Sequence, residues 1–332
     1  MFEDKTVWNA AAVAGTLDDC ARSLEQLGPV RWSFLPSNAA DLKVEARIAD
    51  LKVEARIEEG WLLLNARLPA RRYKPTAATL WHVLKENGGL PGGVKLARLS
   101  GQKELSACAE LRLDREIDLG TRLPQACAGF KAAEAVRVAL PESGELVVPE
   151  GRNLGADEQG GGRSTPSAPT SSDLRELCEE SGWTCTGQPN GRLVVDLDVR
   201  GGFHQAMLQR KANGQVVVTT ELAPRDGSAP ARCRQALGLL LLRACGVVRM
   251  ARAAAGVFEA NASARFEVAF DTEPCAVELA HALSSLSTAC RLCAKEADVL
   301  HSDERIAREY LARWGRASLM PAKGERGNGG SS

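Results

Sequence analysis

Cysteine is the residue type in this sequence that most invites a chemical role. Of the ten cysteines, only Cys290 and Cys293 have the Cys-x-x-Cys spacing used by zinc and redox sites. No second pair of this kind and no nearby histidine pair completes a zinc site. A thioredoxin-like site would also place the pair at a helix N-terminus. Here both thiols continue a helical stripe through Leu279, Leu283 and Leu286, so we expect them to be buried in mid-helix.

The other residues with catalytic potential are scattered along the chain. Four histidines form no metal-binding spacing: His82, His204, His281 and His301. The sequence holds neither a nucleophile elbow nor a phosphate-binding P-loop, and the glycine-rich run 88–93 contains Pro91, which is typical of a helix stop. We therefore expect no catalytic residue, no metal and no cofactor. The protein is predicted not to be an enzyme, and an enzyme with an unrecognised site is the less favoured alternative.

Composition narrows the classes of partner. The chain has 332 residues, with 42 basic and 42 acidic side chains, so it lacks the surplus cation that nucleic-acid binding needs. Aromatic residues make up only 5%, too few for a base-stacking platform. No apolar run reaches the length of a membrane span, and acidic residues near the start argue against a signal peptide. We expect a cytoplasmic protein with reduced thiols, no membrane insertion and no nucleic-acid partner.

Low-complexity sequence divides the chain into two halves. Residues 141–172 are rich in Gly, Ser, Thr and Pro and are predicted to form a flexible linker. Residues 316–332 have the same character and are predicted to be a disordered tail. The predicted domains are therefore 1–140 and 173–315.

The second half predicts a helix, antiparallel strands, a second helix, a strand pair and a long closing helix. An Asp-x-x-Glu capping pattern at Asp173 opens the first helix, and Asn213-Gly214 is a strong hairpin signal. The remaining elements are predicted at Leu193–Val199, Ala231–Cys245, Val248–Ala254, Val257–Phe270, 274–300 and Asp303–Trp314. Strands grouped between helices, without regular alternation, favour an α+β fold.

The first half repeats this order. A helical stripe at Leu17, Leu24 and Leu27 precedes strands across 30–68, and the later elements are predicted at Thr76–Asn87, Val94–Leu99, Leu105–Leu113 and Asp118–Val138. The segment Val94–Arg98 matches Val248–Arg252 in residue type and position. We infer a diverged internal duplication, which predicts two tandem α/β-sandwich domains, each with the order helix, antiparallel strands, helix, β-hairpin, helix.

A second repeat is identical in sequence. Residues 40–48 and 49–57 both read ADLKVEARI. Nine is an odd number, so a continuous strand would turn the apolar side chains of the two copies to opposite faces. The repeat therefore predicts a bulge or a tight turn near Ala49 and Asp50, or extrusion of one copy.

Surplus apolar residues indicate a pairing or binding surface. The run Leu239–Leu242, with Leu237, makes the middle helix of the second half apolar on every side, so it needs cover on two sides. The equivalent helix of the first half poses the same problem. The predicted domain-pairing or partner-binding surface comprises Leu80, Trp81, Leu84, Leu237, Leu240 and Leu241, with the strand positions Val195, Leu197, Val199, Val216 and Val218.

The element order resembles that of bacterial type III secretion chaperones (CesT-like) and of the YbjN-like superfamily. The residues that carry the resemblance are Leu239–Leu242, Val248–Arg252, Glu278–Leu283 and Ala294–Leu300, and in the first half Leu84–Pro91 and Val94–Arg98. The resemblance implies a domain that pairs through its middle helix and strands. Chaperones of this type are usually small, acidic homodimers, whereas this chain is neutral and carries two domains.

The resemblance implies a protein-binding function. Such domains bind an extended segment of another polypeptide, which gains main-chain hydrogen bonds at a sheet edge. We therefore expect a non-enzymatic chaperone-like or adaptor protein, whose client is a secreted or unstable polypeptide. The alternative is a YbjN-like regulatory or scaffold protein. The two domains would form a pseudo-dimer within one chain, or the chain would form a homodimer.

Overall fold

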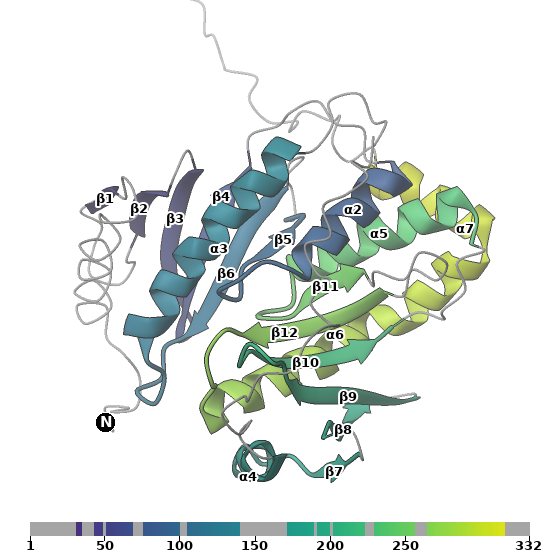
Figure 1. Ribbon diagram of the computed structural model, residues 1–332. Coiled ribbons are helices and arrows are strands. Elements are labelled where there is room, and N and C mark those ends of the chain that lie inside the picture. The colour runs from purple at the N-terminus through teal and green to yellow at the C-terminus, as the bar shows by residue number, and fades with distance from the viewer. Residues whose placement is uncertain are drawn as a thin grey trace, which may run out of the picture.

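The fold is α+β, with helices packed on two antiparallel six-stranded sheets (Figure 1). The computed structural model describes residues 31–34, 43–48, 51–68, 76–99, 105–139, 171–188, 191–199, 202–222, 229–255 and 264–315. The predicted N-terminal helix, residues 141–170 of the predicted linker and the predicted tail lie outside these ranges.

The first half contributes one sheet and two helices. Its strands are β1 (Arg31–Phe34), β2 (Lys43–Ile48), β3 (Leu51–Glu58), β4 (Trp61–Arg67), β5 (Lys95–Ala97) and β6 (Ser106–Arg112), in the spatial order β1-β2-β3-β4-β6-β5. Helix α2 (Ala77–Asn87) joins β4 to β5, and helix α3 (Leu119–Ala139) lies across this sheet in Figure 1. The Thr76 hydroxyl caps α2 by accepting a hydrogen bond from the Thr79 amide.

The second half contributes the other sheet. Its strands are β7 (Cys185–Gly187), β8 (Leu193–Val199), β9 (Gly202–Arg210), β10 (Val216–Glu221), β11 (Arg252–Ala255) and β12 (Ala264–Phe270). The helices are α4 (Ser171–Glu180), α5 (Ala231–Cys245), α6 (Ala276–Ser302) and α7 (Glu304–Tyr310), followed by a π-helical turn at Leu311–Gly315. Helix α4 begins two residues before the predicted domain boundary, and the short strand β7 was not predicted.

The two sheets have the same strand order. Numbered from the start of each half, the order is first, second, third, fourth, sixth, fifth in both sheets. In each half one helix precedes the fifth strand and another follows the sixth. This shared topology is what an internal duplication requires.

The identical repeat forms a hairpin. Its two copies supply the neighbouring antiparallel strands β2 and β3, with Ile48 opposite Leu51 and Ala46 opposite Val53. Even-numbered residues of the first copy therefore face odd-numbered residues of the second, so a reversal between Ile48 and Leu51 places both apolar sets on one side. Of the alternatives that the repeat left open, the antiparallel pairing of β2 with β3 agrees with the reversal, and Ala49 and Asp50 themselves lie outside the described residues.

The strand predicted at Val248–Ala254 is wrong over its first part. Strand β11 begins only at Arg252, and Met250 has a positive φ of 59°, which ends regular strand geometry before that point. The sequence match between Val94–Arg98 and Val248–Arg252 therefore has the wrong register. Hydrogen bonds of the two helix ends, described below, make Lys95 the counterpart of Arg252.

Candidate functional site

Helices α2 and α5 form the main contact between the two halves, as the surplus of apolar residues predicted (Figure 1). Leu80, Leu84, Leu237, Leu240 and Leu241 are all buried. The half-buried Trp81 donates its indole N–H to the Arg234 carbonyl, 3.0 Å away across the contact. The pairing takes place within one chain.

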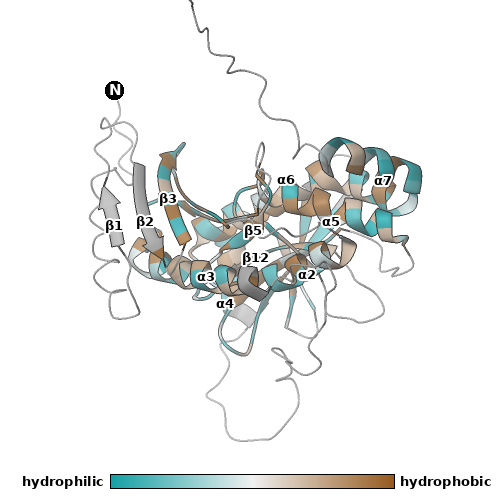
Figure 2. Ribbon diagram, turned by 90° about the horizontal axis from the view of Figure 1, so that it is seen from above, coloured by the Kyte–Doolittle hydropathy of each residue, from teal (hydrophilic) through white to brown (hydrophobic). Residues whose placement is uncertain are grey.

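Helix α5 obtains the two-sided cover that its sequence requires. Besides α2, it contacts α6 and α7 of its own half, and these four helices lie together at the end of the molecule away from β1 and β2 (Figure 2). Arg243 stacks on Trp314 with its guanidinium carbon 3.6 Å from the ring centre, and donates a 2.9 Å hydrogen bond to the Tyr310 hydroxyl. Helices of its own half thus cover one side of α5, and α2 of the first half gives the cover that we expected from a second domain or a partner.

The predicted strand residues lie in the core of the second half. Val195, Leu197, Val216 and Val218 are at most 1% exposed. Helix α6 packs against β8, β9, β10 and β12, and its Cys290 contacts Thr220 at 3.6 Å. None of these four side chains is available to a partner in this conformation. The side chain of Val199 lies outside the described residues.

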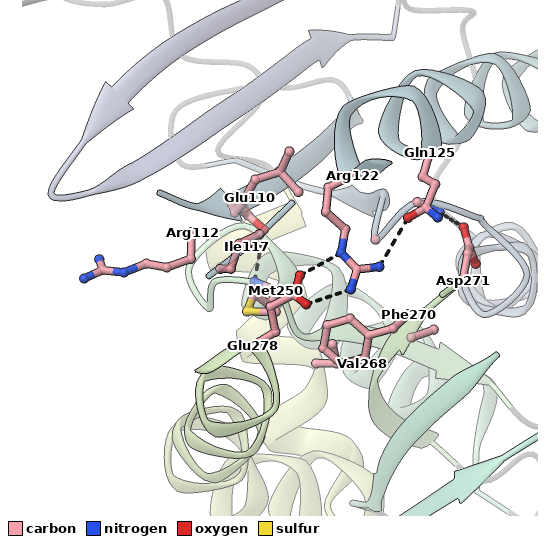
Figure 3. A pocket seen from close by; sticks show the side chains of 14 residues that line it. Glu110, Arg112, Ile117, Arg122, Gln125, Met250, Val268, Phe270, Asp271 and Glu278 are labelled. Carbon is pink, nitrogen blue, oxygen red and sulfur yellow. Dashed lines mark hydrogen bonds and ion pairs between the residues drawn. The ribbon is translucent and has the colours of Figure 1, made fainter. Parts of the chain in front are cut away.

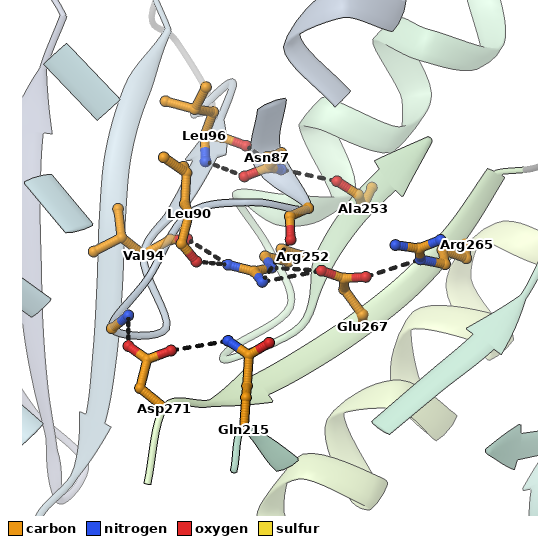
Figure 4. Close-up of polar contacts among 12 residues, drawn as sticks. Asn87, Leu90, Val94, Leu96, Gln215, Arg252, Ala253, Arg265, Glu267 and Asp271 are labelled. Carbon is orange, nitrogen blue, oxygen red and sulfur yellow. Dashed lines mark hydrogen bonds and ion pairs between the residues drawn. The ribbon is translucent and has the colours of Figure 1, made fainter. Parts of the chain in front are cut away.

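Two helix-ending residues make the same local bond in each half. The Asn87 Oδ1 accepts a 2.8 Å hydrogen bond from the Leu96 amide on β5, and the Cys245 Sγ accepts a 3.0 Å bond from the Ala253 amide on β11. Asn87 Nδ2 also donates to the Ala253 carbonyl at 2.8 Å (Figure 4). The same nitrogen approaches the Cys245 Sγ at 3.9 Å. Burial raises the pKa of the Cys245 thiol, so this sulfur is a neutral acceptor.

The first residues of β5 and β11 are buried cations that reach into the opposite half. Lys95 Nζ donates to the Val248 carbonyl at 2.5 Å and pairs with Glu110 at 2.9 Å. Arg252 pairs with Glu267 at 3.0 Å and donates to the carbonyls of Val94, Gly88 and Leu90 (Figure 4). Each cation satisfies carbonyl groups in the loop before the opposite edge strand, so the exchange is reciprocal.

A third buried ion pair joins α3 to α6. Arg122 Nε and Nη2 contact the two carboxylate oxygens of Glu278 at 2.7 and 2.6 Å (Figure 3). Its Nη1 donates to Thr272 Oγ1 at 2.7 Å. The guanidinium also lies over the Phe270 ring, 5.5 Å from its centre. This bidentate geometry fixes the orientation of α3 relative to the second half.

The cavity beside this ion pair is small. It encloses about 40 Å³ between Glu110, Arg122, Met250, Asp271 and Glu278 (Figure 3). That volume holds about three water molecules and is far below that of a ligand pocket. Every charged side chain that lines the cavity at these positions has a partner. Glu110 pairs with Lys95, and Arg122 pairs with Glu278. Asp271 accepts hydrogen bonds from the Gly92 amide at 2.6 Å and from Gln215 at 2.9 Å. These charges hold the halves together.

Buried thiols account for the Cys-x-x-Cys pair. Cys290 and Cys293 are 0% and 2% exposed on the inner side of α6, which confirms that prediction. Burial raises the pKa of Cys293 to about 12. Over the described ranges, no group of three or more His, Cys, Asp or Glu side chains is placed to hold a metal ion.

Among the described residues, no strand pairs with the outer side of β7, and one face of the second sheet carries half-buried side chains. Strand β7 pairs with β8, and Thr186 and Gly187 are exposed. Val194, Met207 and Thr219 lie opposite one another on β8, β9 and β10 and are each half-buried. We call this set, β7 with Val194, Met207 and Thr219, the outer surface of the second sheet. Sequence reasoning missed it because it singled out only the buried alternation of β8 and β10.

Searches against protein-family models, curated proteins and solved structures find no match to this chain. Among the described residues, no helix has the length and apolar character needed to cross a membrane.

Proposed function

We propose that this protein is a chaperone-like or adaptor protein in which two α/β-sandwich domains form a pseudo-dimer and bind an extended segment of another polypeptide. The observation that carries the proposal is the repeated strand order, with equivalent helices α2 and α5 packed together. This is the pairing that the resemblance to type III secretion chaperones and YbjN-like proteins implies.

The outer surface of the second sheet is the binding site that this arrangement favours. The fifth strands of the two halves, β5 and β11, are engaged at the junction through Lys95 and Arg252. Strand β7 lies at the opposite edge of its sheet. An extended segment added beside β7 would gain main-chain hydrogen bonds. Its side chains would lie next to those of β7, and on the face shared with Thr186 the apolar Val194 and Met207 lie one and two strands further in, beside the polar pair Gln205 and Asp196.

Binding of labelled, unstructured peptides with alternating apolar residues tests the proposal by fluorescence anisotropy. We expect some peptides of such a panel to bind, and the same peptides with N-methyl groups on alternate amides to bind at least about tenfold more weakly, because they lose edge hydrogen bonds. The variant Val194→Glu/Met207→Glu should bind weakly, whereas Ala78→Glu, on the exposed side of α2, should bind as the wild type does.

Two outcomes would contradict the proposed site. N-methylated peptides that bind as tightly as their parents would exclude strand addition. Unchanged binding by Val194→Glu/Met207→Glu would exclude Val194 and Met207 from the binding site. A chain that binds no peptide of the panel but binds a folded partner would favour the regulatory or scaffold alternative.

A further inference from the structure

Equivalent residues of the two halves meet each other along α2 and α5. Asn87 and Cys245 are counterparts, because each is the last residue of its helix. Each side chain also accepts a hydrogen bond from the amide of the second residue of the following edge strand. Seven residues earlier in each helix stand Leu80 (87 − 7) and Gly238 (245 − 7). A Cβ built on Gly238 would lie 3.0 Å from the Cβ of Leu80. Both counterpart pairs are therefore in direct contact, two helical turns apart.

This pattern places a pseudo-twofold axis along the seam between two parallel helices. In a dimer of identical subunits, a residue on such an axis meets its own copy. Here the counterparts differ at both points. Leu80 meets a glycine that leaves room for it, and the Asn87 amide meets the Cys245 sulfur at 3.9 Å.

A pair of two identical halves would lose both the contact of Leu80 with Gly238 and the contact of Asn87 with Cys245. Two copies of α2 would bring Leu80 against Leu80 where the present backbones leave room for one side chain. Two copies of α5 would place Gly238 against Gly238 and leave a void. The counterparts Lys95 and Arg252 also differ, and each has its own carboxylate, since Glu110 lies at a different strand position from Glu267. We propose that each half is built to pair with the other half of the same chain and not with a second copy of itself.

A double-variant cycle in the full chain tests the fit between Leu80 and Gly238. Gly238→Leu and Leu80→Gly should each lower the denaturant midpoint, the first through a clash and the second through a void. The exchanged variant Leu80→Gly/Gly238→Leu should recover more than half of the summed loss. Ala78→Gly, at an exposed position of α2, measures the effect of glycine in this helix alone. Losses that simply add in the exchanged variant would overturn the proposal.

Cross-linking identifies which halves pair. The variant Leu80→Cys/Gly238→Cys should form a disulfide within one chain on mild oxidation by copper phenanthroline, because the two Cβ atoms are close enough to be joined. Intact mass would then fall by two hydrogen atoms, since the copper complex and dissolved oxygen take up two electrons with two protons, and no covalent dimer would form. Leu80→Cys alone and Gly238→Cys alone should yield no disulfide-linked dimer through residue 80 or 238. A dimer joined through either residue, or failure of the double variant to cross-link within the chain, would overturn the proposal. The readouts are independent of peptide binding, so the proposed function stands or falls separately.

Discussion

Arg122 on α3 and Glu278 on α6 form a bidentate ion pair, with N–O distances of 2.7 and 2.6 Å, although 156 residues separate them in the sequence. Both side chains are only 9% exposed. Glu278 also accepts a 3.0 Å hydrogen bond from the Cys275 amide and so caps α6. One carboxylate therefore serves both the start of a helix and the junction of the two halves.

Removing one member of this pair should destabilise the fold strongly. Arg122→Ala and Glu278→Ala should each lower the free energy of unfolding by about 3–5 kcal/mol, because each leaves a buried charge without its partner. The apolar double variant Arg122→Met/Glu278→Leu should lose much less than the sum of the two. Urea denaturation measures all three. A loss below about 1 kcal/mol in both single variants, as for an exposed ion pair, would contradict this account.

Asn87 should be as important to the junction as the apolar residues around it. Asn87→Ala leaves the Leu96 amide and the Ala253 carbonyl without their side-chain partner in a buried site. We expect a loss of about 1–3 kcal/mol in the free energy of unfolding. Lys85→Ala, on the exposed side of the same helix, is the matched control and should change stability by less than about 0.5 kcal/mol. Equal losses in the two variants would show that Asn87 has no special role.

Local patterns in the sequence predicted most elements of the fold. The Ala231–Cys245 helix and the hairpin at Asn213-Gly214 were predicted correctly, because capping, turn chemistry and apolar periodicity are encoded within a few residues. The ADLKVEARI repeat predicted a break between its copies for the same reason. Register was harder to predict: Met250 adopts a positive φ that no glycine or asparagine signals, so the β11 boundary was misplaced.

The polar junction could not be predicted in this way. The neighbours of Lys95 and of Arg252 in the sequence are small or apolar residues. A single cation in such a segment does not indicate which group it binds. The carbonyl groups that receive them lie more than 150 residues away in the chain, in loops whose placement depends on the packing of α2 against α5. The sequence predicted that packing through surplus leucines. It did not reveal that buried charges would orient it.

The thiols on α6 should be unreactive in the folded protein. Because burial raises the pKa of Cys293 to about 12, almost none of it is thiolate at pH 8. Iodoacetamide should label Cys290 and Cys293 slowly in buffer and rapidly in urea, as read by peptide mass spectrometry. Cys290→Ala should cost about 1–2 kcal/mol of stability, the effect of deleting a small buried group. Fast labelling of both thiols in the native protein, or stoichiometric zinc lost in Cys290→Ala, would contradict the structural role.

Stability should fall on mild acidification because of His281. This histidine packs edge-on against Trp61, with ring centres 5.3 Å apart, at the contact between α6 and the first sheet. Burial, and then the Arg112 charge, lower the pKa of His281 below its ordinary value of 6.5, while Asp114 acts in the opposite direction. In the unfolded chain His281 therefore binds a proton near pH 6.5, whereas in the folded chain it binds one only at lower pH. The free energy of unfolding consequently decreases as pH falls from about 7 to 5.

Substitution of His281 isolates its share of this pH dependence. Urea midpoints at pH 7.5 and pH 5 should differ less in His281→Gln than in the wild type, because glutamine does not titrate. Some dependence should persist, since burial also lowers the pKa of His82 on α2. The double variant His82→Gln/His281→Gln should therefore have the smallest difference of the three, and the exposed-site variant Lys295→Gln should match the wild type. An unchanged difference in His281→Gln would show that the contact with Trp61 tolerates the charged ring.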